Sequence, residues 1–135
     1  MCDPLDIQAV IFDLDGLMVD TEPFGLEAWQ QCLDPCGLQI QHAHYQQLIG
    51  LGQQETAAYL LELSGASWTP SELLDTFWQC LHSILDTVDL HPRSGLPEVL
   101  AVLGDAKLPL GVASNSPTNY VEHVLERLDL RTMLG

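Results

Sequence analysis

The chain has 135 residues, of which 47% are hydrophobic and 17% charged, so it can bury enough apolar surface to form one folded domain. Its 19 acidic and 4 basic residues give a formal net charge of −15. So few lysines and arginines exclude a surface that neutralises the phosphates of a nucleic acid or of an anionic membrane. We expect neither among its partners, and the sequence carries no signal for an oligomeric state.

The first residues carry no positively charged segment, and the apolar run at 9–12 is too short for a signal peptide or a membrane span. The four cysteines, Cys2, Cys32, Cys36 and Cys80, are scattered along the chain. This spacing favours reduced thiols over a disulfide framework or a zinc site. We therefore predict a cytoplasmic location.

The predicted elements begin with a short apolar run at 8–12 that is rich in β-branched residues and ends in Asp13. Such a run is typical of a buried strand. The pattern then becomes helical, and we predict helices over 23–33, 42–48 and 53–62.

The clearest helical signal follows Thr69, where Thr69 and Glu72 form a capping box and Pro70 suits the first helical position. Apolar residues then recur every three or four positions as far as Val88. This spacing predicts a long amphipathic helix.

The last third of the chain begins with a helix predicted over 96–103 that ends at Gly104. A second strand is predicted over 108–113 and a helix over 117–128, capped by Ser116.

The order of these elements predicts an α/β fold in which a helical segment interrupts the core after its first strand. We assign residues 1–20 and 93–135 to the core and residues 21–92 to the helical insert.

Two carboxylates follow the first predicted strand, Asp13 and Asp15, just before Gly16. In an open α/β sheet, ligands bind at the carboxyl ends of strands. Two carboxylates this close repel each other, so the arrangement requires a cation or a shared proton, and Mg²⁺ is the natural cation for oxygen ligands. A calcium loop does not fit, because Leu17 and Phe24 occupy two of its acidic positions. Ordinary turn chemistry is the alternative for this sequence.

Hydroxyl and amide side chains follow the second predicted strand, at Ser114 and Asn115, beside the start of a helix. Helix N-termini favour anions. Together the two strand ends outline a site for covalent phosphoryl transfer. Taken alone, the Ser114–Ser116 segment is also explained as a helix cap.

The string from Asp13 to Pro23, DLDGLMVDTEP, closely resembles the first motif of the haloacid dehalogenase-like hydrolases, in the branch of sugar-phosphate phosphatases and β-phosphoglucomutases. The segment 113–116, ASNS, resembles their second motif, and 92–95 resembles the return of the chain into the core after a helical cap. The resemblance implies a Rossmann-like core with an inserted all-helical cap.

The resemblance also implies roles for four of these residues. Asp13 would attack phosphorus, and Asp15 would protonate the leaving alcohol and then activate water. Asp13 and the backbone of Asp15 would bind Mg²⁺, and Ser114 with Asn115 would hold the phosphoryl group. The expected enzyme is a phosphoric monoester hydrolase acting on a small phosphorylated metabolite such as a sugar phosphate.

By the same resemblance, Glu22 would lie near substrate where the cap begins, and Gly16 would provide the backbone conformation of the turn. The family's third motif, a lysine, and its fourth, an acidic pair on a later strand, are not found. The only lysine, Lys107, precedes the second motif, and the sequence stops at 128–135, where the next strand is expected to start. We therefore expect an incomplete core, with the chain forming an N-terminal portion of the fold.

Two alternative functions remain. The first is a catalytically incompetent polypeptide that binds a partner or regulates a longer relative. The second is a β-phosphoglucomutase, which is disfavoured because Gly25 stands where these mutases carry a histidine and residues 50–54 include no basic side chain.

Overall fold

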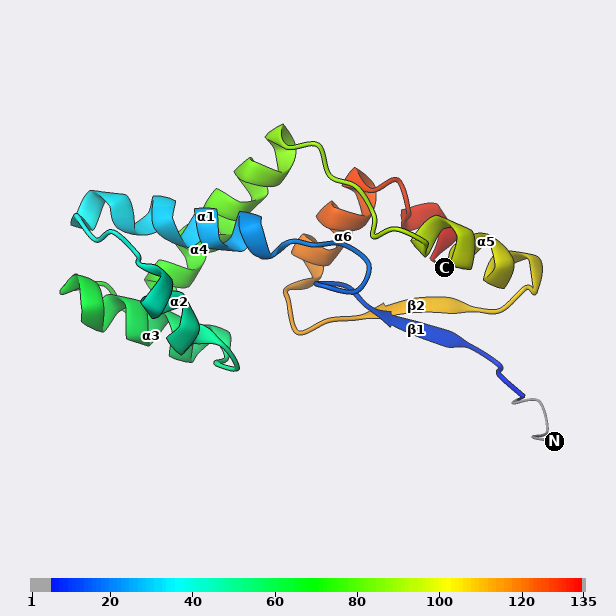
Figure 1. The fold of residues 1–135 in the computed structure, drawn as a ribbon, viewed down its shortest axis with the longest axis horizontal. Coiled ribbons are helices and arrows are strands. Elements are labelled where there is room, and N and C mark those ends of the chain that lie inside the picture. The colour runs from blue at the N-terminus through cyan, green and yellow to red at the C-terminus, as the bar shows by residue number, and fades with distance from the viewer. Residues whose placement is uncertain (1–5, 135) are drawn as a thin grey trace. The chain divides into compact units, whose positions relative to one another are not determined.

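The computed structural model describes residues 6–134 and shows the predicted mixed α/β fold. Two strands, β1 (Val10–Asp13) and β2 (Leu110–Ala113), pair in parallel, with Asp13 opposite Ala113 (Figure 1). Each begins two residues later than the sequence predicts. Because the strands are parallel, the residues that follow them emerge at the same edge of the sheet.

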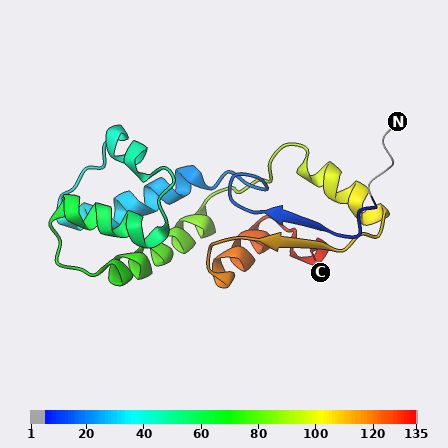
Figure 2. The same cartoon turned by 90° about the horizontal axis from the view of Figure 1, so that it is seen from below.

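Helices α5 (Leu96–Asp105) and α6 (Thr118–Arg127) lie on the same face of this sheet (Figures 1 and 2). Successive side chains of a strand point to opposite faces. Accordingly, Phe12 is only 9% exposed whereas its neighbour Ile11 is 72% exposed. Apolar residues of α5 and α6 complete this part of the core: Leu96, Leu100, Tyr120, Val124 and Leu125.

Four helices form the segment between the strands: α1 (Glu22–Leu33), α2 (His42–Leu48), α3 (Gln53–Ser64) and α4 (Pro70–Thr87). All four were predicted from hydrophobic spacing, with ends that differ by at most two residues. Helix α3 packs beside α4, and the Trp29 ring of α1 stacks on Phe77 of α4 with centroids 4.0 Å apart. Within residues 6–134, no helix is both long and apolar enough to cross a membrane.

The predicted capping box at the start of α4 is confirmed. The backbone N–H of Glu72 donates to the Thr69 hydroxyl oxygen at 3.2 Å, and the backbone N–H of Thr69 donates to Glu72 Oε1 at 3.2 Å. These reciprocal bonds satisfy amide groups that the first turn of a helix leaves without partners.

The chain divides into two compact units, one containing the described residues 6–22 and 88–134 and the other containing residues 23–87. The second unit lies within the helical insert of 21–92 that the sequence predicts. The first unit contains both strands together with α5 and α6. A short helical turn, η1 (Asp34–Cys36), follows α1 in the second unit.

Two predicted helix boundaries are wrong. Helix α5 continues through Gly104 to Asp105, because Lys107, with φ of 58°, adopts the left-handed conformation that often ends a helix. Ser116 does not cap α6, whose N-cap residue is Pro117 and receives no side-chain capping bond. The Ser116 hydroxyl instead donates to a carboxylate oxygen of Asp15 at 3.4 Å.

Three described cysteines, Cys32, Cys36 and Cys80, are free thiols, as predicted, and Cys2 lies outside the described residues. The sulfur atoms of Cys32 and Cys80 lie 3.7 Å apart. Burial, followed by the neighbouring Cys80, raises the pKa of Cys32 to about 12. Cys32 therefore remains protonated at neutral pH and is a poor nucleophile.

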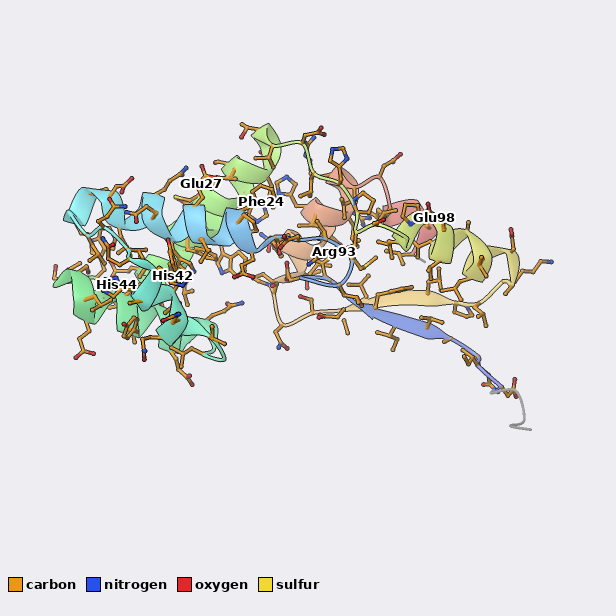
Figure 3. The ribbon with its side chains drawn as sticks, viewed as in Figure 1. Phe24, Glu27, His42, His44, Arg93 and Glu98 are labelled. Atoms are coloured by element: carbon orange, nitrogen blue, oxygen red, sulfur yellow. The ribbon has the colours of Figure 1, made fainter. Side chains whose placement is uncertain are left out.

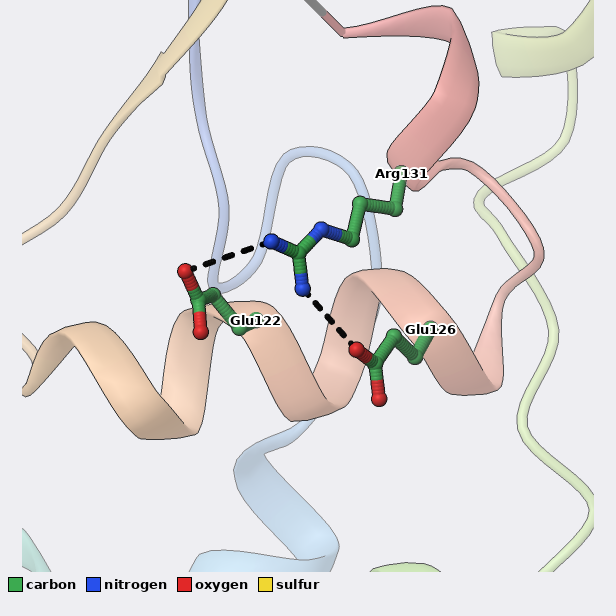
Figure 4. Close-up of polar contacts among 3 residues, drawn as sticks. All are labelled: Glu122, Glu126 and Arg131. Carbon is green, nitrogen blue, oxygen red and sulfur yellow. Dashed lines mark hydrogen bonds and ion pairs between the residues drawn. The ribbon is translucent and has the colours of Figure 1, made fainter.

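The end of the first unit is held by exposed ion pairs. After α6, the turn η2 (Arg131–Met133) places the Arg131 guanidinium 2.9 Å from Glu126 and 3.6 Å from Glu122 (Figure 4). The three side chains are 50–59% exposed. Solvent screens such pairs, which individually contribute less than about 1 kcal/mol.

Candidate functional site

The two carboxylates predicted from the sequence lie at the carboxyl end of β1. Asp13 is the last residue of the strand and is exposed. Its Oδ1 atom accepts the backbone N–H of Leu14 at 3.0 Å, and its other oxygen has no partner among residues 6–134. The Leu14 side chain is fully buried and anchors the chain here. Asp13 therefore presents one carboxylate oxygen to solvent from a fixed backbone.

A tight turn follows Asp15. Gly16 has a φ of 86°, its N–H donates to the carbonyl of Val19 at 2.8 Å, and the N–H of Met18 donates to the carbonyl of Leu14 at 3.0 Å. Only glycine adopts this left-handed conformation without steric cost. The turn conformation expected of Gly16 is confirmed.

This conformation predicts a stability difference between two glycines. Gly16→Ala is expected to lower the free energy of unfolding by about 1–2 kcal/mol, because an alanine at positive φ is strained. Gly104→Ala is the matched control, because Gly104 lies in helix α5 with open space around the added methyl group. Since alanine is favoured over glycine within a helix, this substitution should raise the free energy of unfolding by up to about 1 kcal/mol. Urea unfolding followed by circular dichroism measures both. Equal effects of the two substitutions would contradict the prediction.

Three hydroxyl groups hold the carboxylate of Asp15. The hydroxyls of Thr21 and Tyr120 both donate to Oδ1, at 2.5 and 2.7 Å, and the hydroxyl of Ser116 donates to Oδ2 at 3.4 Å. Thr21 is 7% exposed and Tyr120 only 2%. Asp15 is thus tied to α6 and to the loop that follows β2, whereas Asp13 is open to solvent.

Tyr120 remains a hydrogen-bond donor over the physiological pH range. Burial and then the negative charge of Asp15 raise the pKa of this phenol well above its ordinary value, and the hydrogen bond to Asp15 adds to the shift. The phenol therefore stays protonated and keeps its O–H directed at the carboxylate.

Sequence reasoning missed Tyr120, Thr21 and Arg93 as parts of this site. Tyr120 reads as one more apolar position of an amphipathic helix, and Thr21 lies inside the first motif without a distinguishing signal. The backbone N–H of Arg93 donates to the carbonyl of Met18 at 2.7 Å, and its Nε–H donates to the carbonyl of Gly16 at 3.2 Å (Figure 3). A cation therefore braces the loop that carries both carboxylates.

The other predicted site residues lie as follows. Ser114 is half-buried after β2, and its hydroxyl oxygen accepts the N–H of Ser116 at 3.1 Å. Asn115 is exposed in the same loop. Because Ala113 is the register partner of Asp13, both follow β2 at the edge where β1 ends. Glu22 begins α1, is exposed, and makes no hydrogen bond or ion pair within the described part of the chain.

The donor set at this edge fits part of a Mg²⁺ site. Asp13 offers an exposed carboxylate, and Mg²⁺ prefers oxygen ligands and commonly keeps several waters beside one or two carboxylates. Among residues 6–134, no three His, Cys, Asp or Glu side chains are grouped to hold a metal ion.

Comparison with known proteins identifies the family of this chain. The family model of the haloacid dehalogenase-like hydrolases matches residues 10–134. The chain is 27% identical to the phosphorylated carbohydrates phosphatase of Thermotoga maritima over 92% of its own length and 57% of that protein. It is 32% identical to the fructose-1-phosphate phosphatase YqaB of Escherichia coli K12, over 90% of its length and 63% of that protein.

Among solved structures, CbbY from Rhodobacter sphaeroides in complex with phosphate superposes with a TM-score of 0.81 at 19% identity, over 95% of this chain and 61% of that one. This likeness shows the shared fold. The chain thus spans about 60% of the length of the relatives it matches. The family model covers nearly all of the described residues, both strand ends included, and the chain belongs to the haloacid dehalogenase-like hydrolases.

Proposed function

We propose that this chain forms part of a Mg²⁺-dependent phosphatase that hydrolyses a small phosphorylated metabolite through an aspartyl-phosphate intermediate. One observation carries the proposal: an exposed carboxylate, Asp13, and a carboxylate held by hydroxyl groups, Asp15, lie two residues apart at one edge of a parallel sheet. Two carboxylates in such different surroundings suit the separate tasks of a nucleophile and an acid–base group.

In the first step, the open oxygen of Asp13 attacks phosphorus while the bond from phosphorus to the leaving oxygen breaks. Asp15 gives its proton to that oxygen, and the product leaves as an alcohol. In the second step, Asp15, now a carboxylate, takes a proton from water as the water oxygen attacks phosphorus. The bond between phosphorus and Asp13 breaks, and inorganic phosphate is released.

Neutral donors at the neighbouring strand end would hold the phosphoryl group. The Ser114 hydroxyl and the Asn115 amide follow β2 at the same edge, just before the N-terminus of α6. Free N–H groups at a helix start add a favourable field for an anion. The oxygen of Asp13 that does not attack phosphorus and the backbone carbonyl of Asp15 would hold Mg²⁺, which when bound neutralises negative charge on the phosphoryl group.

We further propose a sugar phosphate as the class of substrate, with Glu22 near it. The support is that two relatives are named as phosphatases of phosphorylated carbohydrates and of fructose 1-phosphate. A cytoplasmic location is part of the proposal, as are small-molecule partners rather than nucleic acid or membrane. The net charge of −15 supports the exclusion of those two polyanionic partners.

The test is release of inorganic phosphate from a panel of sugar monophosphates, with Mg²⁺ and after its removal by EDTA. The assay uses the 135-residue chain and, where the reading frame continues, the longer product. We expect at least one sugar phosphate to be hydrolysed with Mg²⁺ and the activity to be lost with EDTA. Failure of every form to release phosphate would contradict the proposal and favour a binding or regulatory polypeptide.

A further inference from the structure

The hydrogen bonds around Asp15 are unevenly divided between its two oxygens. Oδ1 accepts the hydroxyl of Tyr120 at 2.7 Å and also the hydroxyl of Thr21. Among residues 6–134, Oδ2 receives only the 3.4 Å contact from Ser116, which is too long for a strong hydroxyl hydrogen bond. The two strong donors therefore converge on one oxygen.

This asymmetry decides which oxygen of Asp15 can carry a proton. A carboxyl oxygen that already accepts two O–H groups has no room for a proton of its own, because its lone pairs are occupied. The proton of a neutral Asp15 must then lie on Oδ2. The same two donors stop the carboxyl group from rotating, so Oδ2 keeps one direction through both proton transfers.

Tyr120 is the more rigid of the two strong donors. Its side chain is 2% exposed, and on α6 it shares the buried face with Val124, four residues further along. Thr21 lies in the segment just before α1. A phenol on a packed helix has few alternative rotamers, so the position of its O–H is set by the core.

We propose that Tyr120 is a positioning residue that fixes Oδ1 of Asp15 by hydrogen bonding and so assigns the catalytic proton to Oδ2. This inference rests on the function proposed above. In this role Tyr120 acts on the reaction through the direction of the Asp15 proton.

The test is Tyr120→Phe, which removes the hydroxyl and keeps the ring. The substitution is made in whichever form of the protein releases phosphate, the 135-residue chain or the longer product, and is assayed with two substrates. For an alkyl phosphate such as a sugar phosphate, the leaving oxygen needs the Asp15 proton, and kcat/KM is expected to fall about tenfold. For p-nitrophenyl phosphate, the phenolate leaves without a proton, and kcat/KM should change by less than about twofold. Tyr59→Phe, on α3 in the other unit, is the matched control and should change neither value.

The outcomes separate this inference from the function on which it rests. Equal losses with both substrates, or no loss with either, in Tyr120→Phe would overturn the positioning role. Asp15→Asn should show the same dependence on the leaving group with a larger loss. If Asp15→Asn lowers kcat/KM, which reports the first step, equally for both substrates, or no form of the protein is active, the proposed function fails and this inference fails with it. If the loss in kcat/KM depends on the leaving group in Asp15→Asn but not in Tyr120→Phe, this inference alone is overturned.

Discussion

Asp13→Asn is expected to reduce phosphate release by at least about 10³-fold, with both a sugar phosphate and p-nitrophenyl phosphate as substrates. An amide has the shape of the carboxylate but cannot form the aspartyl-phosphate bond. The amide also lacks the negative charge of the carboxylate, so it weakens the proposed hold on Mg²⁺. Because the leaving group plays no part in either effect, the reduction should be the same for both substrates, unlike that of Tyr120→Phe.

The matched control for this substitution is Asp105→Asn at the end of α5, an exposed carboxylate in the same unit. It should leave kcat and KM unchanged. Asp13 is exposed and its side chain accepts one backbone hydrogen bond, so Asp13→Asn should not unfold the chain, and circular dichroism checks this. Turnover that survives in a folded Asp13→Asn protein would sink the covalent mechanism.

Phe77→Ala is expected to lower the free energy of unfolding by about 3–5 kcal/mol, the largest stability effect we predict. Phe77 is 7% exposed, its ring stacks on Trp29 at 4.0 Å, and the edge of Trp78 lies against it with centroids 5.0 Å apart. Truncation leaves a cavity between α1 and α4 and removes the aromatic stacking.

Urea unfolding of the Phe77→Ala chain, followed by circular dichroism, gives this loss. Gln79→Ala, an exposed change on the same helix, should stay within about 0.5 kcal/mol of the unchanged protein. A loss below about 1 kcal/mol for Phe77→Ala would show that the stacked pair does not lie in the core of this unit. Trp29 and Trp78 flank the mutated ring, so circular dichroism is a better probe of unfolding than tryptophan fluorescence.

Local sequence rules predict most of the secondary structure because their causes are local. The capping box of Thr69 with Glu72 specifies the start of α4, and the apolar stripe that follows specifies its buried face. The end of α5 was misplaced at Gly104 because glycine signals a helix end only when no other residue takes the left-handed position, and here Lys107 takes it.

The site shows where such rules end. Asp13 and Asp15 stand out because two carboxylates this close repel each other and so require a cation or a shared proton. The hydrogen bond from Tyr120 joins residues 105 positions apart, and no periodicity in the sequence signals it. Ser116 looks like a helix cap until the fold brings Asp15 within reach of its hydroxyl. Contacts of this kind depend on how β2 and α6 are placed against the first strand.

The hydrogen bond from the N–H of Arg93 to the carbonyl of Met18 has a consequence for how such proteins diversify. It joins the segment just before residues 23–87 to the segment just after them. The Arg127 guanidinium also donates to the carbonyl of Val88 in the second of these segments, at 2.9 Å. The entropic cost of closing the intervening loop grows only with the logarithm of its length, and doubling that length costs about 0.6 kcal/mol. Helices can therefore be added to or removed from the inserted unit while the turn that carries Asp13 and Asp15 keeps its shape.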